Sequence, residues 1–159
     1  MRKLLIITLV VLNIVLNGQN LFPETFSDCD SKEFFIEWKE IYTENLNTDL
    51  ISEIINNIND KTLKKIKGEI LIQVYIDTIG NPCCVSIKND LNAKGKIVDF
   101  KQIINTQTKW TAPNRQGKNK AVSIIIKMTF NKDRIILQRL GFNMKEGLIE
   151  LSRNELIKE

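Results

Sequence analysis

The sequence predicts an α+β domain, in which a small antiparallel sheet of three or more strands carries helices packed on one face. Two stretches predict the sheet, because apolar and polar residues alternate along residues 69–77 and again along residues 121–130. Three other stretches repeat apolar residues at helical spacing. Together these patterns give the element order α-α-β-β-α-β, with the second face of the sheet partly open.

The first twenty residues have the form of a secretory signal peptide. Arg2 and Lys3 precede an apolar run from Leu4 to Leu16, and a short polar stretch ends the run. The run is shorter than the roughly 20 residues of a membrane-spanning helix. We therefore expect residues 1–20 to direct export and to be removed near residues 18–20. The alternative is an uncleaved N-terminal segment that anchors the chain to the inner membrane.

Two amphipathic helices are predicted ahead of the sheet. The first follows Ser31, within a lead-in and helix region at residues 21–47, and the second follows Thr48 and ends near Gly68. Their apolar stripes favour burial in a core over contact with a ligand. The first stripe consists of Phe34, Trp38, Ile41 and Tyr42, and the second of Leu50, Ile51, Ile54, Ile55 and Ile58.

The strand at residues 69–77 leads into a predicted hairpin. Asp77, Gly80, Asn81 and Pro82 supply the turn, and a second strand follows it. Because side chains alternate between the two faces of a strand, the pattern assigns each residue to a face. The inward set is Ile70, Ile72, Val74, Ile76, Cys83, Val85 and Ile87, and the outward set includes Cys84, Ser86 and Lys88.

Three cysteines, Cys29, Cys83 and Cys84, bear on the redox compartment. Export would place them in an oxidising space, where we expect one disulfide and one remaining thiol. Neighbouring residues on a strand point to opposite faces, so Cys83 and Cys84 are not expected to bond each other. We expect Cys83 to be a small buried core residue. The sequence leaves open whether Cys29 pairs with Cys83 or with Cys84.

A third helix is predicted from Ile97 or Asp99 to Lys109, and it places Trp110 at its end. Pro113 prevents the helix from continuing, and a flexible polar loop around Gly117 follows. The last strand then presents one apolar face, formed by Val122, Ile124, Ile126, Met128 and Phe130. Residues 131–159 form a C-terminal extension. In it, residues 134–140 fit a strand or a helix, and residues 143–158 fit a short helix.

The chemical inventory argues against an enzyme. The chain has no histidine, which excludes histidine-assisted nucleophiles and histidine metal ligands. It has no phosphate-binding glycine loop. We therefore expect no catalytic residues, no cofactor, no metal and no small-molecule substrate. Without Arg2 and Lys3, 21 of the 23 basic residues remain against 19 acidic ones, a balance of +2 that argues against a nucleic-acid partner.

The stretch from residue 48 to residue 130 resembles the TonB C-terminal domain family. The family has a glycine before an alternating strand, an Asp–x–x–Gly turn, a helix that ends in tryptophan, a nearby proline, a loop glycine and a last strand ending in phenylalanine. In this sequence these positions are Gly68, Asp77, Gly80, Trp110, Pro113, Gly117 and Phe130. The lead-in FPETFSDCD also looks like that of stand-alone TonB-like proteins of the Bacteroidetes.

The resemblance implies a periplasmic domain that takes part in TonB-linked transmembrane transport. In the family, the final strand is a sheet edge that binds a short segment of a protein partner by strand addition. The partner would be an outer-membrane TonB-dependent transporter or another envelope protein. The resemblance thus assigns partner binding to the edge strand, with Ala121, Ser123, Ile125, Lys127 and Thr129 as contacts. Trp110 and Pro113 would serve as scaffold, and a homodimer remains open.

The sequence departs from a complete energy transducer, because it lacks a long proline-rich spacer that could cross the periplasm. Its three prolines are Pro23, Pro82 and Pro113. We therefore expect a free-standing module. The alternative is an envelope structural or assembly factor that uses the fold as a scaffold, without energy transduction, and contacts its partner through residues 131–159. A strand at residues 131–140 would cover the proposed edge and would directly overturn strand addition at residues 121–130.

Overall fold

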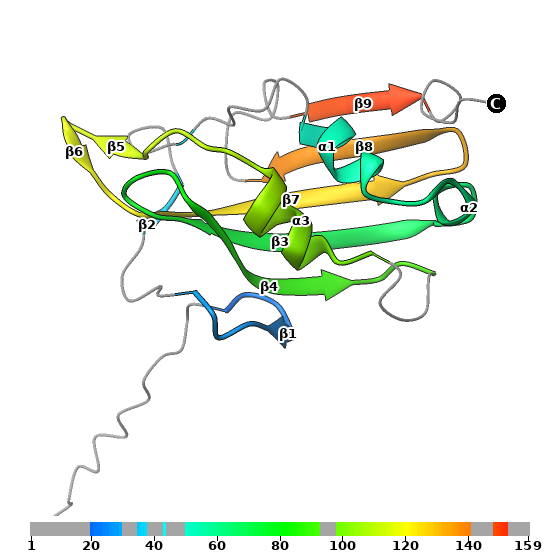
Figure 1. Ribbon diagram of the computed structural model, residues 1–159, viewed down its shortest axis with the longest axis horizontal. Helices are drawn as coiled ribbons and strands as arrows, with labels where there is room; N and C mark the ends of the chain where they lie inside the picture. The colour runs from blue at the N-terminus through cyan, green and yellow to red at the C-terminus, as the bar shows by residue number, and fades with distance from the viewer. Residues whose placement is uncertain are drawn as a thin grey trace, which may run out of the picture.

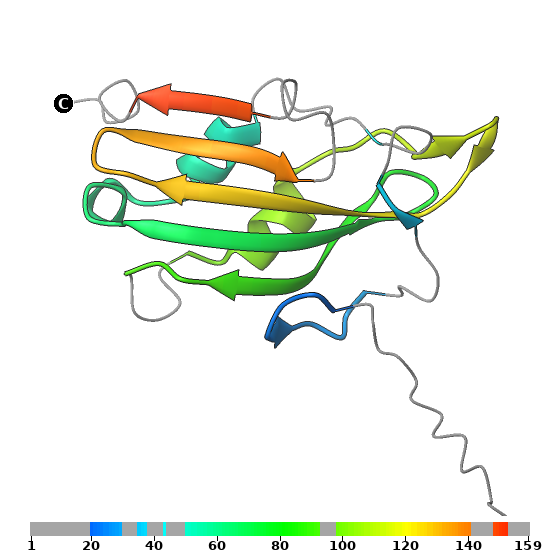
Figure 2. The same ribbon diagram turned by 180° about the vertical axis from the view of Figure 1, so that it is seen from behind.

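The computed structural model describes residues 20–29, 35–37, 43, 50–92, 98–140 and 148–152. It shows an α+β architecture, in which helices lie on one face of a twisted sheet (Figure 1). Seen from behind, the strands lie in front of the helices (Figure 2). The elements are β1 Glu24–Thr25, β2 Phe35–Ile36, α1 Leu50–Asn56, α2 Asp60–Leu63, β3 Gly68–Ile76, β4 Pro82–Asn89, α3 Phe100–Gln107, β5 Asn114–Arg115, β6 Lys118–Asn119, β7 Val122–Phe130, β8 Arg134–Leu140 and β9 Leu148–Ser152.

The main sheet has the strand order β1-β4-β3-β7-β8-β9, and β2 pairs with β7 off this path. All pairings along the path are antiparallel, whereas β2 runs parallel to β7. The α+β class and the antiparallel sheet are therefore confirmed. The predicted order α-α-β-β-α-β is wrong, because two short strands precede the first described helix and two more main-sheet strands follow β7.

The core lies between the sheet and the helices α1 and α3. Asp99 caps α3, since its Oδ1 accepts a hydrogen bond from the Gln102 N–H at 2.9 Å. The predicted alternation of β3 and the predicted third helix are both confirmed. Core side chains from the two layers include Ile51, Ile54, Ile70, Ile72, Val74, Phe100, Ile103, Ile104, Ile124 and Ile126.

The first predicted helix is wrong at Phe35 and Ile36, which form β2. These residues pair with Val122 and Ser123, and the Glu37 N–H donates to the Ser123 carbonyl oxygen at 3.1 Å. The pairing of β8 with β7 begins only at Ile125, so the start of β7 needs another neighbour. Aromatic and β-branched residues suit that position. Glu37 is not helical either, and the other residues of the predicted helix, including Phe34 and Trp38, lie outside the described residues.

The second predicted helix is present but interrupted. Helix α1 ends at Asn56, and α2 begins at Asp60 after Asn59, whose side chain accepts a hydrogen bond from the Thr62 N–H at 2.9 Å. The side chain of Asn57 also donates to the Glu53 carbonyl oxygen at 2.7 Å. Asparagine side chains compete for backbone hydrogen bonds in this way, which favours caps over helix interiors. Thr48, the predicted cap, lies outside the described residues.

A β-bulge in β4 reverses the predicted orientation of its first half. Gln73 pairs with Ser86, whereas Val74 pairs with Cys84, so Val85 has no partner of its own on β3. Beyond the bulge, Cys84 lies opposite Val74 in the core and Cys83 lies opposite Tyr75. The inward position predicted for Cys83 and the outward position predicted for Cys84 are therefore both wrong. The inward position of Ile87, on the other side of the bulge, is confirmed.

The polar loop predicted around Gly117 is a small hairpin formed by β5 and β6. Its two turn residues, Gln116 and Gly117, have φ angles of 51° and 80°. Positive φ at both central residues defines the two-residue turn that suits the twist of a hairpin. The Asn114 side chain accepts a hydrogen bond from the Gly117 N–H at 2.9 Å. The sequence predicts a loop here, and the structure gives that loop two short paired strands.

The C-terminal extension continues the sheet. Residues 134–140 form strand β8, which decides between the two predicted alternatives, and residues 148–152 form strand β9. The helix predicted for residues 143–158 is therefore wrong at residues 148–152, and its remaining residues lie outside the described ones. In the part of the chain that the structure describes, no helix combines the length and apolar character needed to cross a membrane.

Candidate functional site

The strand assigned to partner binding lies inside the sheet. Strand β7 pairs with β3 along its whole length, from Val122 to Phe130. On its other side, β8 covers residues 125–130 and β2 covers residues 122 and 123. The expectation of an edge at residues 121–130 is therefore wrong, because alternation identifies a strand but not its neighbours. This applies to four of the five predicted contacts, Ser123, Ile125, Lys127 and Thr129, whereas the fifth, Ala121, lies just before β7 and is buried.

The side chains predicted for binding take part in contacts within the sheet. The Lys127 ammonium lies 2.8 Å from Oε1 of Glu69, and the Thr129 hydroxyl donates to the same oxygen at 3.3 Å. The hydrogen bond from Lys127 lowers the pKa of the Glu69 carboxyl below its usual value. Ser123 Oγ accepts a hydrogen bond from the Gln73 side chain at 3.1 Å. These residues stabilise neighbouring strands on the helix-free face.

The residues that carry the family resemblance lie in three places. Gly68 and Phe130 are register partners at one end of the β3–β7 pair. At the other end, Asp77 closes the hairpin turn, because its Oδ1 accepts hydrogen bonds from the Ile79 and Asn81 N–H groups, both at 2.8 Å. Gly80 packs against the backbone of Trp110. Pro113, three residues after Trp110 in the sequence, is buried. Gly117 lies in the separate β5–β6 hairpin.

Trp110 occupies a structural position in this arrangement. Its side chain is buried, and its indole N–H donates to the Thr108 hydroxyl at 2.9 Å. The guanidinium carbon of Arg139, on β8, lies 5.2 Å from the ring centroid. Trp110 therefore links the end of α3 to the added strand β8.

Within the described residues, the sheet ends at β9 on one side and at β1 on the other. On one side the last strand is β9, which pairs with β8 through residues 148–152. No strand pairs with the outer side of β9 in the described part of the chain. On the opposite side, β4 is covered by residues 20–29, which we call the N-terminal segment. These two sides are the candidate docking edges.

The N-terminal segment crosses from the β4 edge onto the helix-free face. Its β1 strand pairs Glu24 with Ile87 and Thr25 with Ser86, and the Phe26 N–H donates to the Val85 carbonyl oxygen at 2.9 Å. The preceding residues continue over the sheet. The Leu21 N–H donates to Oε1 of Gln73 at 2.8 Å, and the Phe22 N–H donates to Oγ of Ser86 at 3.2 Å.

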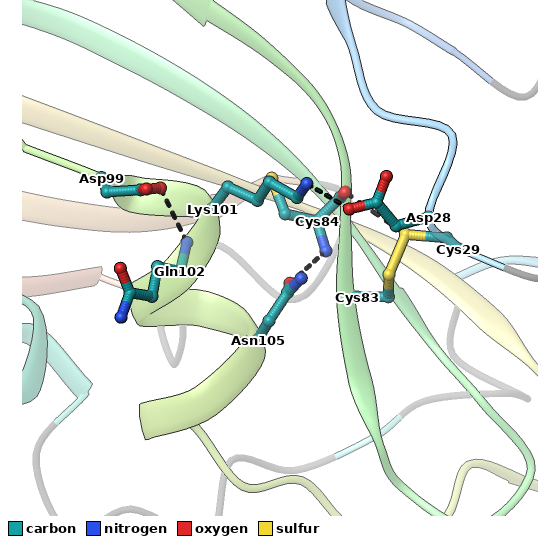
Figure 3. Close-up of polar contacts among 8 residues, drawn as sticks. All are labelled: Asp28, Cys29, Cys83, Cys84, Asp99, Lys101, Gln102 and Asn105. Carbon is teal, nitrogen blue, oxygen red and sulfur yellow. Dashed lines mark hydrogen bonds and ion pairs between the residues drawn. A yellow bond between two sulfur atoms is a disulfide. The ribbon is translucent and has the colours of Figure 1, made fainter. Parts of the chain in front are cut away.

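A disulfide between Cys29 and Cys83 fixes the end of this segment to β4 (Figure 3). The two Cα atoms lie 5.8 Å apart, and 54 positions separate the cysteines in the sequence. An ion pair between Asp28 and Lys101 of α3 adds a second contact, and the Lys101 ammonium lies 4.9 Å from the Phe26 ring centroid. The expectation of a single disulfide and one remaining thiol among the three cysteines is confirmed, with Cys83 as the partner of Cys29.

The remaining thiol, Cys84, is adjacent to the disulfide but poorly suited to exchange with it. Burial raises the pKa of the Cys84 thiol to about 12. The Cys84 backbone N–H donates to the Asn105 side chain of α3 at 2.7 Å, which holds this part of β4 against the helix. Because only the thiolate attacks a disulfide, the arrangement favours a structural cross-link over a redox centre.

Comparison with protein-family models, with curated proteins and with solved structures finds no match for this chain. The TonB-like assignment therefore remains a prediction from the sequence. Among the described residues, no group of three or more histidine, cysteine, aspartate or glutamate side chains is placed to hold a metal ion.

Proposed function

We propose that this chain is a non-catalytic protein-binding domain of the cell envelope, which docks on a partner protein by strand addition at β9. One observation carries the proposal: the sheet grows past β7 through β8 to β9, and within the described residues it ends there. An outer strand carries backbone N–H and C=O groups that an extended segment of another protein can pair with. We therefore propose residues 148–152, and not residues 121–130, as the docking edge.

Two features support an envelope location for this domain. The first twenty residues have the pattern of an export signal. The Cys29–Cys83 disulfide suits an oxidising compartment, because cytosolic thiols are kept reduced. On the family resemblance, the partner is an outer-membrane TonB-dependent transporter, and the periplasm is where the two would meet.

The second candidate function is an assembly factor that uses the sheet as a scaffold. The pairing of β8 with β7 favours it, since this pairing fills the edge that the family would use. In this case, the C-terminal extension would contact a folded surface of the partner and would not accept a free peptide. The two functions therefore differ in their response to an isolated extended peptide.

An NMR titration tests the proposal. The exported chain, labelled with ¹⁵N, would be titrated with extended N-terminal peptides of TonB-dependent transporters from the same organism. Strand addition predicts the largest amide shifts at residues 148–152, with small changes in the interior strand β7. Shifts that are absent, or that concentrate elsewhere, would contradict docking at β9.

Two proline variants provide a matched control. In an antiparallel pair, successive residues point their N–H groups alternately toward and away from the neighbouring strand. Of Ile149→Pro and Glu150→Pro, one therefore breaks the pairing with β8 and the other removes an outward N–H. Strand addition predicts that the variant that keeps the melting temperature of the parent chain loses peptide binding. If that variant binds normally, β9 is not the docking edge.

A further inference from the structure

A groove lies at the opposite side of the sheet from β9, between β1, the end of β4 and the first turn of α3. Its volume is about 580 Å³, which falls within the roughly 300–1,000 Å³ typical of ligand pockets. Ile70, Ile87 and Phe100 form an apolar floor, and Phe26 forms one wall. Glu24 and Asp99 stand at the rim, where both side chains are exposed.

The groove exists because β1 stops short of the end of β4. Strand β1 pairs only with Ser86 and Ile87. Pro23 lies directly before β1. At this point the chain turns onto the helix-free face, where the Phe22 N–H donates a hydrogen bond to Oγ of Ser86. In the described part of the chain, no strand covers the outer side of β4 beyond Ile87. The last part of the β4 edge therefore opens into the groove.

Among the described residues, the side chains that line the groove, together with the ion-pair partner of Lys101, carry a net negative charge. Lys101 lines the groove, but its ammonium group is paired with Asp28. Counting these two with Glu24 and Asp99 gives one positive and three negative side chains, a net charge of −2. Figure 3 shows Asp99 beside Lys101 at the start of α3. An apolar floor with an acidic rim suits a ligand that joins an apolar group to a positive charge.

We propose that this groove binds a short peptide segment of a partner protein in which apolar side chains flank a lysine or an arginine. The apolar side chains occupy the floor over Ile70, Ile87 and Phe100. The basic side chain stays at the rim, within reach of the carboxylates of Glu24 and Asp99. This site is independent of the proposed strand addition, because it lies beyond β4 whereas β9 lies on the other side of the sheet.

Calorimetric titration with two tripeptides tests the proposal directly. The probes are N-acetyl-Phe-Lys-Phe-amide and N-acetyl-Phe-Glu-Phe-amide, which differ only in the central charge. We expect the lysine peptide to bind about tenfold more tightly at low ionic strength, with the preference shrinking as salt is added. Equal affinities, or no binding of either peptide, would overturn the proposal.

Two sets of variants locate the site. Glu24→Gln with Asp99→Asn removes both rim charges and keeps the α3 cap, because asparagine caps helices as well as aspartate does. This double variant should abolish the preference for the lysine peptide. Asn89 pairs with Ile70 and shares its face, so Asn89→Trp places a ring in the groove and should weaken both peptides about tenfold or more. Unchanged binding in either case would overturn the assignment.

A final variant distinguishes a partner from the chain itself. Residues 93–97 lie in the sequence between Leu91 and Val98, which both line the groove, and they include Lys94 and Lys96. If a partner segment is the occupant, Lys94→Ser with Lys96→Ser should leave the affinity for the lysine peptide within about twofold. A large gain in affinity would show that these lysines compete for the groove, and the partner proposal would then fail. The variant Ile149→Pro or Glu150→Pro that keeps its stability should bind the tripeptides normally, whatever becomes of strand addition at β9.

Discussion

The carboxylate of Glu37 accepts a hydrogen bond from Nη2 of Arg139, although 102 positions separate the two residues. Arg139 also donates to the Thr43 carbonyl oxygen at 2.6 Å, and the Thr43 hydroxyl donates to the Thr111 carbonyl oxygen at 2.6 Å. Glu37 is 1% exposed, so burial raises the pKa of its carboxyl and the arginine opposes this. This contact ties β2 and β8 to the region around Trp110.

We predict that Arg139→Met lowers the free energy of unfolding by about 3–5 kcal/mol, because it leaves a buried carboxylate without its partner. Urea unfolding would measure the change. The double variant Arg139→Met with Glu37→Met is the control, and it should recover most of the loss, since replacing both charges with apolar side chains removes the penalty. A single variant as stable as the parent would contradict the role of the pair.

Loss of the Cys29–Cys83 disulfide should destabilise the domain by about 4 kcal/mol, because the cross-link restricts a long loop in the unfolded chain. Cys29→Ser and Cys83→Ser should have similar effects in chemical unfolding under oxidising conditions. The double variant should cost no more than either single one. Strongly additive effects would mean that each cysteine has a separate stabilising role.

Cys84 should remain unreactive in the folded protein. Because burial raises its pKa to about 12, a thiol reagent at pH 8 should label no cysteine in the native state and one after unfolding without reductant. Mass spectrometry would count the labels. Fast labelling of the native protein would contradict the buried position.

The same thiol gives a pH dependence of stability. Its folded-state pKa of about 12 lies above the ordinary value of 9.0, so the folded state holds the proton more tightly. The stability that this provides is complete below about pH 9 and is lost as the pH rises toward about 12. The alanine side chain of Cys84→Ala does not titrate. The difference between the unfolding free energies of the parent and this variant should therefore become smaller as the pH rises from about 9 to about 12. A constant difference would contradict the shifted pKa.

Two glycines with similar backbone angles should respond very differently to alanine. Gly80 has a φ of 94°, and an added Cβ would lie 2.3 Å from the Trp110 carbonyl oxygen. Gly117 has a φ of 80° and open space around it. We therefore predict a loss of about 1 kcal/mol for Gly117→Ala, from the backbone alone, and a loss at least about twice as large for Gly80→Ala. Thermal unfolding would compare them, and equal losses would contradict the close packing at Gly80.

The parts of the fold that the sequence predicts well are those that depend on neighbouring residues. The alternation of β3, the turn at Asp77 and Gly80, and the helix α3 all lie within short windows. The alternation of β7 likewise predicts a strand correctly. Local patterns therefore identify most of the central elements.

The errors arise where distant residues decide the structure. Phe35 and Ile36 lie within a stretch whose apolar spacing suits a helix, but pairing with β7 makes them a strand. The position of β7 in the sheet depends on β8, whose own sequence fits two structures. The bulge at Val85 leaves no mark in the apolar pattern, so the facing of Cys83 could not be predicted. Because β8 and β2 pair with β7, the last alternating strand of the predicted domain is not the sheet edge that the family resemblance implies.

The bulge at Val85 gives the adjacent cysteines Cys83 and Cys84 a further meaning. Loss of the bulge without a deletion would pair Val74 with Val85 and Tyr75 with Cys84, turning Cys84 outward and Cys83 inward. Cys84 would then stand where Cys83 now meets Cys29. The vicinal pair thus makes the cross-link tolerant of a loss of the bulge, which would leave a single cysteine on the wrong face. This strand can therefore switch between a bulged and a regular pairing with β3 without losing its covalent attachment to the N-terminal segment.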